Sequence, residues 1–286
     1  MTRLIDGLSS LAGDYDVLLC DIWGVIHNGR EAFPAACAAL ARWRAERGPV
    51  VLISNSPRPW PGVAAQLDDL GAPREAWTSI VTSGDATRVL LADRAPGPAW
   101  RIGPERDEPL YDGLGLTFTD VESARFIACT GPNDDEVETP EDYRAILSRA
   151  TARGLEMVCA NPDRVVQRGD RLIYCGGALA ELYQQLGGRA IMAGKPFGPI
   201  YDLSLRAADR ALGRAHDRRR VLVLGDGVAT DIAGAQAQDL DRVFIATGIH
   251  AGEAAGGDGA LSAGAIDALL GASGLSAQFA MGDLVW

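Results

Sequence analysis

Short runs of apolar residues recur along the chain, and each of them ends at a polar or charged side chain or at a glycine. The runs share a continuous apolar character: Val17–Cys20, Val50–Ile53, Ala190–Gly194, Val221–Leu224 and Val243–Ala246. Such runs are typical of buried parallel strands, because helices cover both faces of a parallel sheet. We therefore predict that these segments are strands of a parallel sheet.

Helices are predicted between these runs. Ala35–Arg47 carries apolar residues at helical spacing and is followed by Gly48–Pro49, a pair that ends a helix. Val63–Leu70 ends at Gly71, and Pro199–Arg214 is amphipathic. The alternation of strand and helix predicts an α/β protein with a Rossmann-like parallel sheet that helices cover on both faces.

A second series of strands and helices interrupts the first. It begins at Trp100–Gly103, and the short apolar runs Phe126–Cys129 and Met157–Ala160 are predicted as strands. Thr139 and Pro140 mark the start of a helix between the last two, as N-cap and first helical residue. A segment of this length folds as its own unit and not as a loop. We predict a first domain of residues 1–83 plus 189–286 and an inserted α/β domain of residues 84–188.

The polar residues at the ends of the first-series runs have the chemistry of a phosphate-handling site. They directly follow an apolar run or open the next helix: Asp21, Ser54, Asn55, Lys195, Asp226 and Asp231. Open α/β sheets bind their ligands at the carboxyl ends of strands, where these residues would lie. Each residue alone also has an ordinary explanation, since Ser54 suits a helix cap, Lys195 a loop and Asp226 a turn. The set as a whole favours one site.

The order of these motifs, with a long insertion between Ser54 and Lys195, resembles the haloacid dehalogenase (HAD) superfamily of aspartate-nucleophile hydrolases. The resemblance covers nearly the whole chain and is strongest to the large-cap NagD-like phosphatase branch. It implies a HAD core with an inserted cap domain, and a Mg²⁺-dependent phosphatase that acts on a small phosphorylated metabolite through an aspartyl-phosphate. Asn161–Pro162–Asp163 and Cys175–Leu179 look like cap signatures of that branch. The branch often dimerises through its caps, so the resemblance also implies a homodimer.

The resemblance assigns the nucleophile and the metal ligands. Asp21 is the expected catalytic nucleophile, which would attack phosphorus and divide the reaction into two steps. Asp226 is expected to hold Mg²⁺ together with Asp21 and the main-chain carbonyl of Trp23. Asp231 would bind the metal or orient a water molecule on it.

Phosphate binding is expected to depend on three further residues. The ammonium group of Lys195 would offset the charge of the phosphate and of the nucleophile, which makes it part of the catalytic set. The Ser54 hydroxyl and the main-chain amide N–H at Asn55 would donate to phosphate oxygens at the strand end. The formal net charge of −11 makes such local donors necessary, because the overall field of the protein repels anions.

One position departs from the family pattern. The family's phosphatases have a second Asp two residues after the nucleophile, which protonates the leaving oxygen and then activates water, and here this residue is Trp23. Indole does neither, and general acid–base catalysis is worth about 10²- to 10⁴-fold in rate, or about 3 to 5 kcal/mol. Three consequences are open: substrates whose leaving group needs little protonation, such as aryl or acyl phosphates; a proton from His27; or binding without efficient turnover.

Two other function classes compete with the phosphatase. A catalytically impaired phosphometabolite-binding or regulatory protein would explain Trp23. A carbon–halogen hydrolase of the same superfamily would need no Mg²⁺, and Asp226 and Asp231 argue for a metal. The glycines at 225 and 227 also suggest a dinucleotide motif, but Thr230 stands where the third glycine of G-x-G-x-x-G is required.

Composition and charge indicate the general class of protein. The chain has 286 residues, 47% of them hydrophobic and 23% charged, which is typical of a globular protein long enough for two domains. No apolar run approaches the ~18 residues of a membrane span, and the N-terminus lacks a secretory pattern, so we expect a cytoplasmic protein. The negative net charge argues against a nucleic-acid partner. The scattered cysteines predict buried free thiols.

Overall fold

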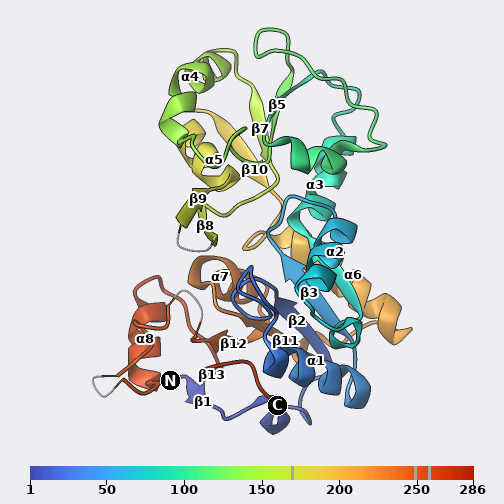
Figure 1. Ribbon diagram of the computed structural model, residues 1–286, viewed down its shortest axis with the longest axis vertical. Coiled ribbons are helices and arrows are strands. Elements are labelled where there is room, and N and C mark those ends of the chain that lie inside the picture. Colours follow the sequence, from blue (N-terminus) through green and yellow to red (C-terminus); the bar gives the residue numbers. More distant parts are fainter. Residues whose placement is uncertain (169–170, 248–249, 257–258) are drawn as a thin grey trace. The chain divides into compact units, whose positions relative to one another are not determined.

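Strand β2, Val17–Asp21, lies inside a seven-stranded sheet with the order β1-β13-β12-β11-β2-β3-β4 (Figure 1). The computed structural model describes residues 1–286 except 169–170, 248–249 and 257–258. The other strands of this sheet are β1 (Arg3–Leu4), β3 (Val50–Ser54), β4 (Ser79–Thr82), β11 (Val221–Gly225), β12 (Asp241–Ile245) and β13 (Phe279–Met281). The pairings from β1 across to β3 are parallel. This confirms the predicted α/β fold with a Rossmann-like parallel sheet.

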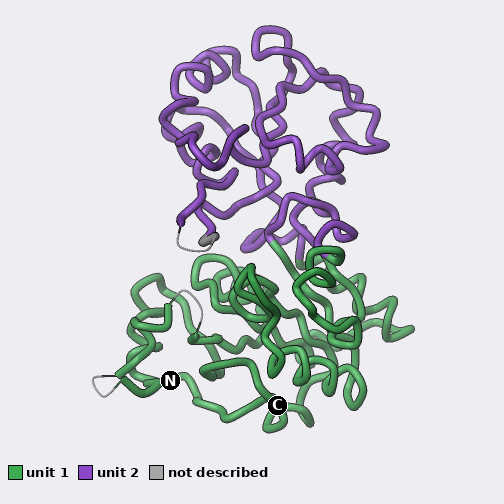
Figure 2. The backbone as a smooth tube through the Cα atoms, viewed as in Figure 1, with its two compact units in different colours: residues 1–54, 64–81, 201–286 green, residues 55–63, 82–200 purple. Residues whose placement is uncertain are grey.

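Two compact units divide the chain, and Figure 2 colours them separately. The first unit comprises residues 1–54, 64–81 and 201–286, and the second comprises residues 55–63 and 82–200. Five helices lie wholly or mostly in the first unit: α1 (Pro34–Glu46), α2 (Trp60–Asp69), α6 (Gly198–Leu212), α7 (Ala233–Ala237) and α8 (Ala263–Gly271). Every residue of β2 and β11 is buried, as their continuous apolar character predicted.

The register of the central strands brings their carboxyl ends to one edge of the sheet. Asp21 pairs with Ile53, so Ser54 lies one residue beyond the level of Asp21. Cys20 pairs with Leu224, so Asp226 also lies one residue past that level. Polar side chains that directly follow buried strands therefore meet at this edge.

The second unit is built on a parallel four-stranded sheet with the order β10-β7-β6-β5. Its elements in chain order are α3 (Ser83–Ala92), β5 (Ala99–Ile102), β6 (Phe126–Cys129), α4 (Arg144–Ala152), β7 (Glu156–Cys159), the antiparallel pair β8 (Val165–Arg168) and β9 (Arg171–Tyr174), α5 (Gly176–Gln185) and β10 (Arg189–Met192). Pro140 begins a 3₁₀ turn, Pro140–Tyr143, that continues as α4. The side chains of Leu147, Met157 and Tyr183 pack in the core of this unit.

The strand before Lys195 lies in the second sheet. The sequence predicted that residues 190–194 form a strand of the first domain, which was to resume at residue 189. The strand exists, as β10, but its predicted assignment to the first domain was wrong. It pairs in parallel with β7 and belongs to the second unit. All its residues are exposed or half-buried, as on an edge strand. Apolar character alone did not distinguish the two sheets.

All five cysteines are buried free thiols, as expected. Among the helices of the described residues, none combines the length and the apolar character that crossing a membrane requires.

Candidate functional site

Three carboxylates lie together in the first unit. Asp21 ends β2, Asp226 directly follows β11, and Asp231 lies in the π-helical turn Val228–Ile232 that leads into α7. One oxygen from each side chain lies within 4.8 Å of the others, and the three residues are only 7%, 5% and 1% exposed. Buried carboxylates this close repel one another unless a cation offsets their charge. Their hard oxygen donors suit a divalent ion such as Mg²⁺.

Glycines leave the space that these carboxylates occupy. A Cβ atom at Gly225 would lie 2.2 Å from the carboxyl carbon of Asp231, and one at Gly24 would lie 2.4 Å from Oδ2 of Asp226. Gly24 also has a φ of +85°, in the left-handed region. The Gly227 N–H donates to Oδ2 of Asp231 at 3.2 Å. The backbone of the two loops therefore determines how the carboxylates approach each other.

The loop after β2 packs the Trp23 indole against His27 and Gly29. The two rings meet edge to face, with centroids 5.0 Å apart and planes at 75°. Gly29 has a φ of +83°, and a Cβ atom there would lie 2.6 Å from Cη2 of the indole. The Gly24 N–H donates to the His27 carbonyl at 2.8 Å, which closes the loop. Trp23 is thus part of the packing of the loop that carries it.

His27 is held as a neutral imidazole at physiological pH. It is 2% exposed, and this burial lowers its pKa to about 4. The Gly29 N–H donates to Nδ1 of His27 at 2.9 Å, so the proton of the neutral ring lies on Nε2. Only roughly one imidazole in a thousand is protonated at pH 7. His27 can therefore act as a general acid to a substantial extent only at acidic pH.

We expect the buried His27 to make the protein less stable in acid. Its folded pKa is lowered, so its contribution is complete above the unfolded value of 6.5 and is lost as the pH falls toward 4. Between pH 7 and pH 5 the loss is at most about 2 kcal/mol. Denaturant unfolding at pH 7 and pH 5 measures this loss in the wild type and in His27→Asn. The asparagine keeps an acceptor for the Gly29 N–H. Equal losses in both proteins would contradict a neutral His27.

The remaining predicted residues divide between the two units. Ser54 is the half-buried last residue of β3, at the same sheet edge as Asp21. Asn55 and Lys195 belong to the second unit and are 6% and 3% exposed. The Lys195 N–H donates to Oδ1 of Asn55 at 2.7 Å. Nδ2 of Asn55 in turn donates to the Lys195 carbonyl at 3.1 Å and to Oδ1 of Asp163 at 2.8 Å. The contact of Asp163 was not predicted, although its Asn-Pro-Asp motif was noted.

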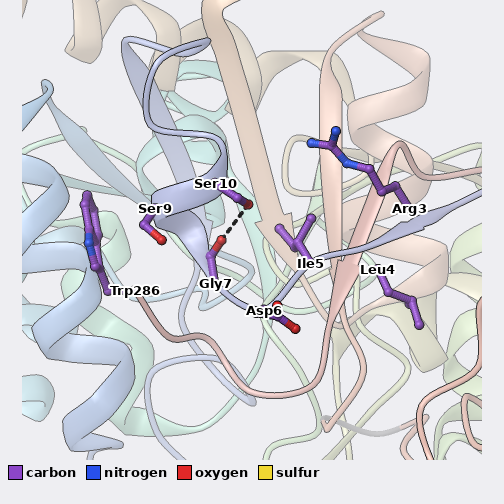
Figure 3. Close-up of a pocket in the computed structure, with 8 residues that line it drawn as sticks. All are labelled: Arg3, Leu4, Ile5, Asp6, Gly7, Ser9, Ser10 and Trp286. Carbon is purple, nitrogen blue, oxygen red and sulfur yellow. Dashed lines mark hydrogen bonds between the residues drawn. The ribbon is translucent and has the colours of Figure 1, made fainter.

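A separate cavity of about 400 Å³ lies beside the N-terminal segment (Figure 3). Its lining consists of Arg3, Leu4, Ile5, Asp6, Gly7, Ser9, Ser10 and Trp286. The Ser10 hydroxyl donates to the Gly7 carbonyl at 2.9 Å, so these two lining residues are hydrogen-bonded to each other. None of the clustered carboxylates lines this cavity.

Comparison with known proteins identifies the family of the chain. A family model described as haloacid dehalogenase-like hydrolase matches residues 18–117, and one described as HAD-hydrolase-like matches residues 192–270. A crystal structure of a haloacid dehalogenase-like hydrolase from Brucella suis is 45% identical, covers 99% of this chain and 100% of its own, and superposes with a TM-score of 0.88.

Two relatives named as phosphatases are more distant in sequence. An acid sugar phosphatase of Staphylococcus saprophyticus is 25% identical over 82% of this chain and 88% of its own length. A D-glycerol 3-phosphate phosphatase of Mycobacterium tuberculosis is 28% identical over 85% of this chain and 66% of its own length. The 45% identity to the Brucella suis structure over the full length of both chains, together with the two matched family models, shows that the chain belongs to the haloacid dehalogenase-like hydrolases.

Proposed function

We propose that this protein is a Mg²⁺-dependent phosphatase of a small phosphorylated metabolite. The observation that carries the proposal is the buried cluster of Asp21, Asp226 and Asp231 at the carboxyl edge of the sheet. The names of two relatives, an acid sugar phosphatase and a D-glycerol 3-phosphate phosphatase, support small phosphate esters as the substrate class. Trp23, which stands where the family has its second Asp, makes turnover dependent on the leaving group.

The metal-binding part of the proposal concerns four groups. The carboxylates of Asp21, Asp226 and Asp231 and the main-chain carbonyl of Trp23 are all oxygen donors, which Mg²⁺ prefers. When bound, the cation would offset the charge of the carboxylates and of the phosphate, so that an anionic nucleophile can approach an anionic ester. Gly24 leaves the room that the Asp226 carboxylate occupies in this position.

The chain's own residues then carry the reaction. We propose that a carboxylate oxygen of Asp21 attacks phosphorus, that the bond to the ester oxygen breaks, and that an aspartyl-phosphate forms. The Lys195 ammonium, the Ser54 hydroxyl and the main-chain N–H of Asn55 would bind the phosphoryl oxygens during this transfer. Water hydrolyses the aspartyl-phosphate, releases phosphate and regenerates Asp21.

Trp23 is the reason to expect a strong preference among substrates. Indole neither protonates the departing oxygen nor removes a proton from water, and the His27 ring is neutral at pH 7. Esters whose leaving group departs readily as an anion, such as p-nitrophenyl phosphate or an acyl phosphate, depend least on that proton. We therefore infer that aryl and acyl phosphates are hydrolysed faster than alkyl phosphates.

We expect Trp23→Asp to raise kcat/KM for an alkyl phosphate such as glycerol phosphate by about 10²-fold or more. The gain for p-nitrophenyl phosphate should be much smaller, because that leaving group needs little protonation. Trp23→Phe is the matched control, since it keeps an aromatic ring against His27 and Gly29 without adding an acid. Steady-state assays with Mg²⁺, accompanied by thermal melting of each variant, measure the effect.

Two outcomes would change the proposal. A wild type that binds phosphate esters but hydrolyses none, with turnover appearing in Trp23→Asp, would favour the phosphometabolite-binding or regulatory protein. If Trp23→Asp leaves turnover unchanged while His27→Asn abolishes it, His27 supplies the proton despite its lowered pKa. Equal rates for aryl and alkyl esters in the wild type would contradict the role given to Trp23.

A further inference from the structure

The Asn55 side chain holds the main chain of Lys195 at two points. Its Oδ1 accepts the Lys195 N–H at 2.7 Å, and its Nδ2 donates to the Lys195 carbonyl at 3.1 Å. A main-chain N–H only donates and a carbonyl only accepts, so these bonds define which end of the amide is nitrogen. A Cβ atom at Gly194 would lie 2.7 Å from Oδ1 of Asn55, which shows how closely the two segments approach.

Asp163 occupies the remaining donor position of that amide. Its Oδ1 accepts from Nδ2 of Asn55 at 2.8 Å. With this bond the Asn55 side chain uses its carbonyl once and both of its amide hydrogens. A rotation of the amide would then break three hydrogen bonds, among them one to a carboxylate, and such charge-assisted bonds are stronger than neutral ones. Asp163 therefore restricts Asn55 to the orientation that contacts Lys195.

Asp163 is itself held firmly. Its N–H donates to Oδ1 of Asn161 at 3.1 Å, and its carbonyl accepts from the Gly177 N–H at 3.0 Å, at the start of α5. A Cβ atom at Gly177 would lie 2.0 Å from the Pro162 carbonyl oxygen, so this loop lies directly against the helix. Gly177, inside the Cys175–Leu179 motif, thus leaves room for the Asn-Pro-Asp loop to pack against α5.

The charge of Lys195 also reaches Asp163. Surrounding protein raises the pKa of the Asp163 carboxyl, whereas the hydrogen bond from Asn55 and the positive charge of Lys195 lower it. The opposite charges favour each other, and the lysine is 3% exposed. A residue that contacts Asn55 and attracts Lys195 acts on both proposed phosphate-binding groups of this unit.

We propose that Asp163 is a positioning residue for phosphate binding, which acts through Asn55 to hold the segment that carries Lys195. This rests on the proposed function, in which the main-chain N–H of Asn55 and the ammonium group of Lys195 bind the phosphoryl group. Asp163 does not itself touch phosphate in this scheme. Its loss should therefore weaken the binding of phosphate and of substrate more than it lowers kcat.

The test compares Asp163→Ala with Asp163→Asn. Asp163→Ala removes the acceptor of Asn55, and we expect the affinity for inorganic phosphate, measured by titration calorimetry with Mg²⁺, to fall about 10- to 100-fold. KM for p-nitrophenyl phosphate should rise by a similar factor. Asp163→Asn keeps an acceptor oxygen of the same size and should recover most of the affinity. Asp112→Ala, an exposed aspartate of the same unit, is the matched control and should resemble the wild type.

The outcomes separate this inference from the proposed function. Unchanged phosphate affinity and KM in Asp163→Ala, or a loss of kcat and melting temperature alone, would overturn the positioning role. If Asp163→Ala fails to fold, Asp163→Asn is compared with Asn55→Ala. Wild-type phosphate affinity in Asp163→Asn is the predicted recovery and supports the positioning role. A phosphate affinity of Asp163→Asn as low as that of Asn55→Ala overturns the positioning role. A wild type that neither binds phosphate nor hydrolyses esters would overturn both proposals.

Discussion

Asp21→Asn is expected to lower kcat for p-nitrophenyl phosphate at least about 10⁴-fold, the effect of removing a catalytic nucleophile. The amide keeps the size of the carboxylate but has no negative charge with which to attack phosphorus. Because Asp21 is 7% exposed and ends a buried strand, an isosteric change disturbs the fold less than a truncation would. Loss of activity with an unchanged melting curve would therefore report on chemistry.

The control for this experiment is Asp14→Asn. Asp14 lies just before the same strand and is exposed, so its replacement changes the net charge equally without touching the carboxylate cluster. It should retain wild-type activity. Activity that survives Asp21→Asn would remove Asp21 from the mechanism, and with it the aspartyl-phosphate.

Asp226→Asn is expected to weaken Mg²⁺ binding at least about 100-fold and to lower activity accordingly at a fixed Mg²⁺ concentration. The cluster with Asp21 and Asp231 loses one of its negative charges, and an amide oxygen is a weaker ligand for a hard cation. Excess Mg²⁺ should restore part of the activity of this variant but none of that of Asp21→Asn. The two substitutions therefore distinguish a metal ligand from a nucleophile.

Titration calorimetry with Mg²⁺ and activity measured against Mg²⁺ concentration give the two readouts. Asp239→Asn is the matched control, because Asp239 is exposed in the turn after α7 and its φ of 54° is one that asparagine tolerates. An Asp226→Asn variant with wild-type Mg²⁺ affinity would contradict the proposed metal site.

Much of the first unit could be predicted from local patterns. The runs that became β2, β3 and β11 are continuously apolar, and strands that helices cover on both faces must be so. Asp21 and Asp226 were identified as edge residues because each stands where an apolar run ends. The order of the motifs along the chain predicted that both residues share a site with Asp231, and the three carboxylates do lie together.

Other features depended on contacts between distant segments. The strand before Lys195 was assigned to the wrong sheet, because its apolar residues suit either sheet and its pairing with β7 decides the matter. The bond between Asn55 and Asp163 joins residues that are 108 positions apart, and no periodic pattern predicts it. The pKa of His27 likewise depends on burial by segments that the sequence does not identify.

The sequence by itself determined which residues carry reactive groups and where the strands that present them end, since both follow from residue type and local patterning. Only the tertiary structure decided which of those ends meet. Strand register brings Asp21 level with the end of β11, and the glycine at 225 lets Asp231 close on the same point. Hydrogen bonding between distant loops then sets how Asn55 holds Lys195, because such bonds exist only once the chain has folded.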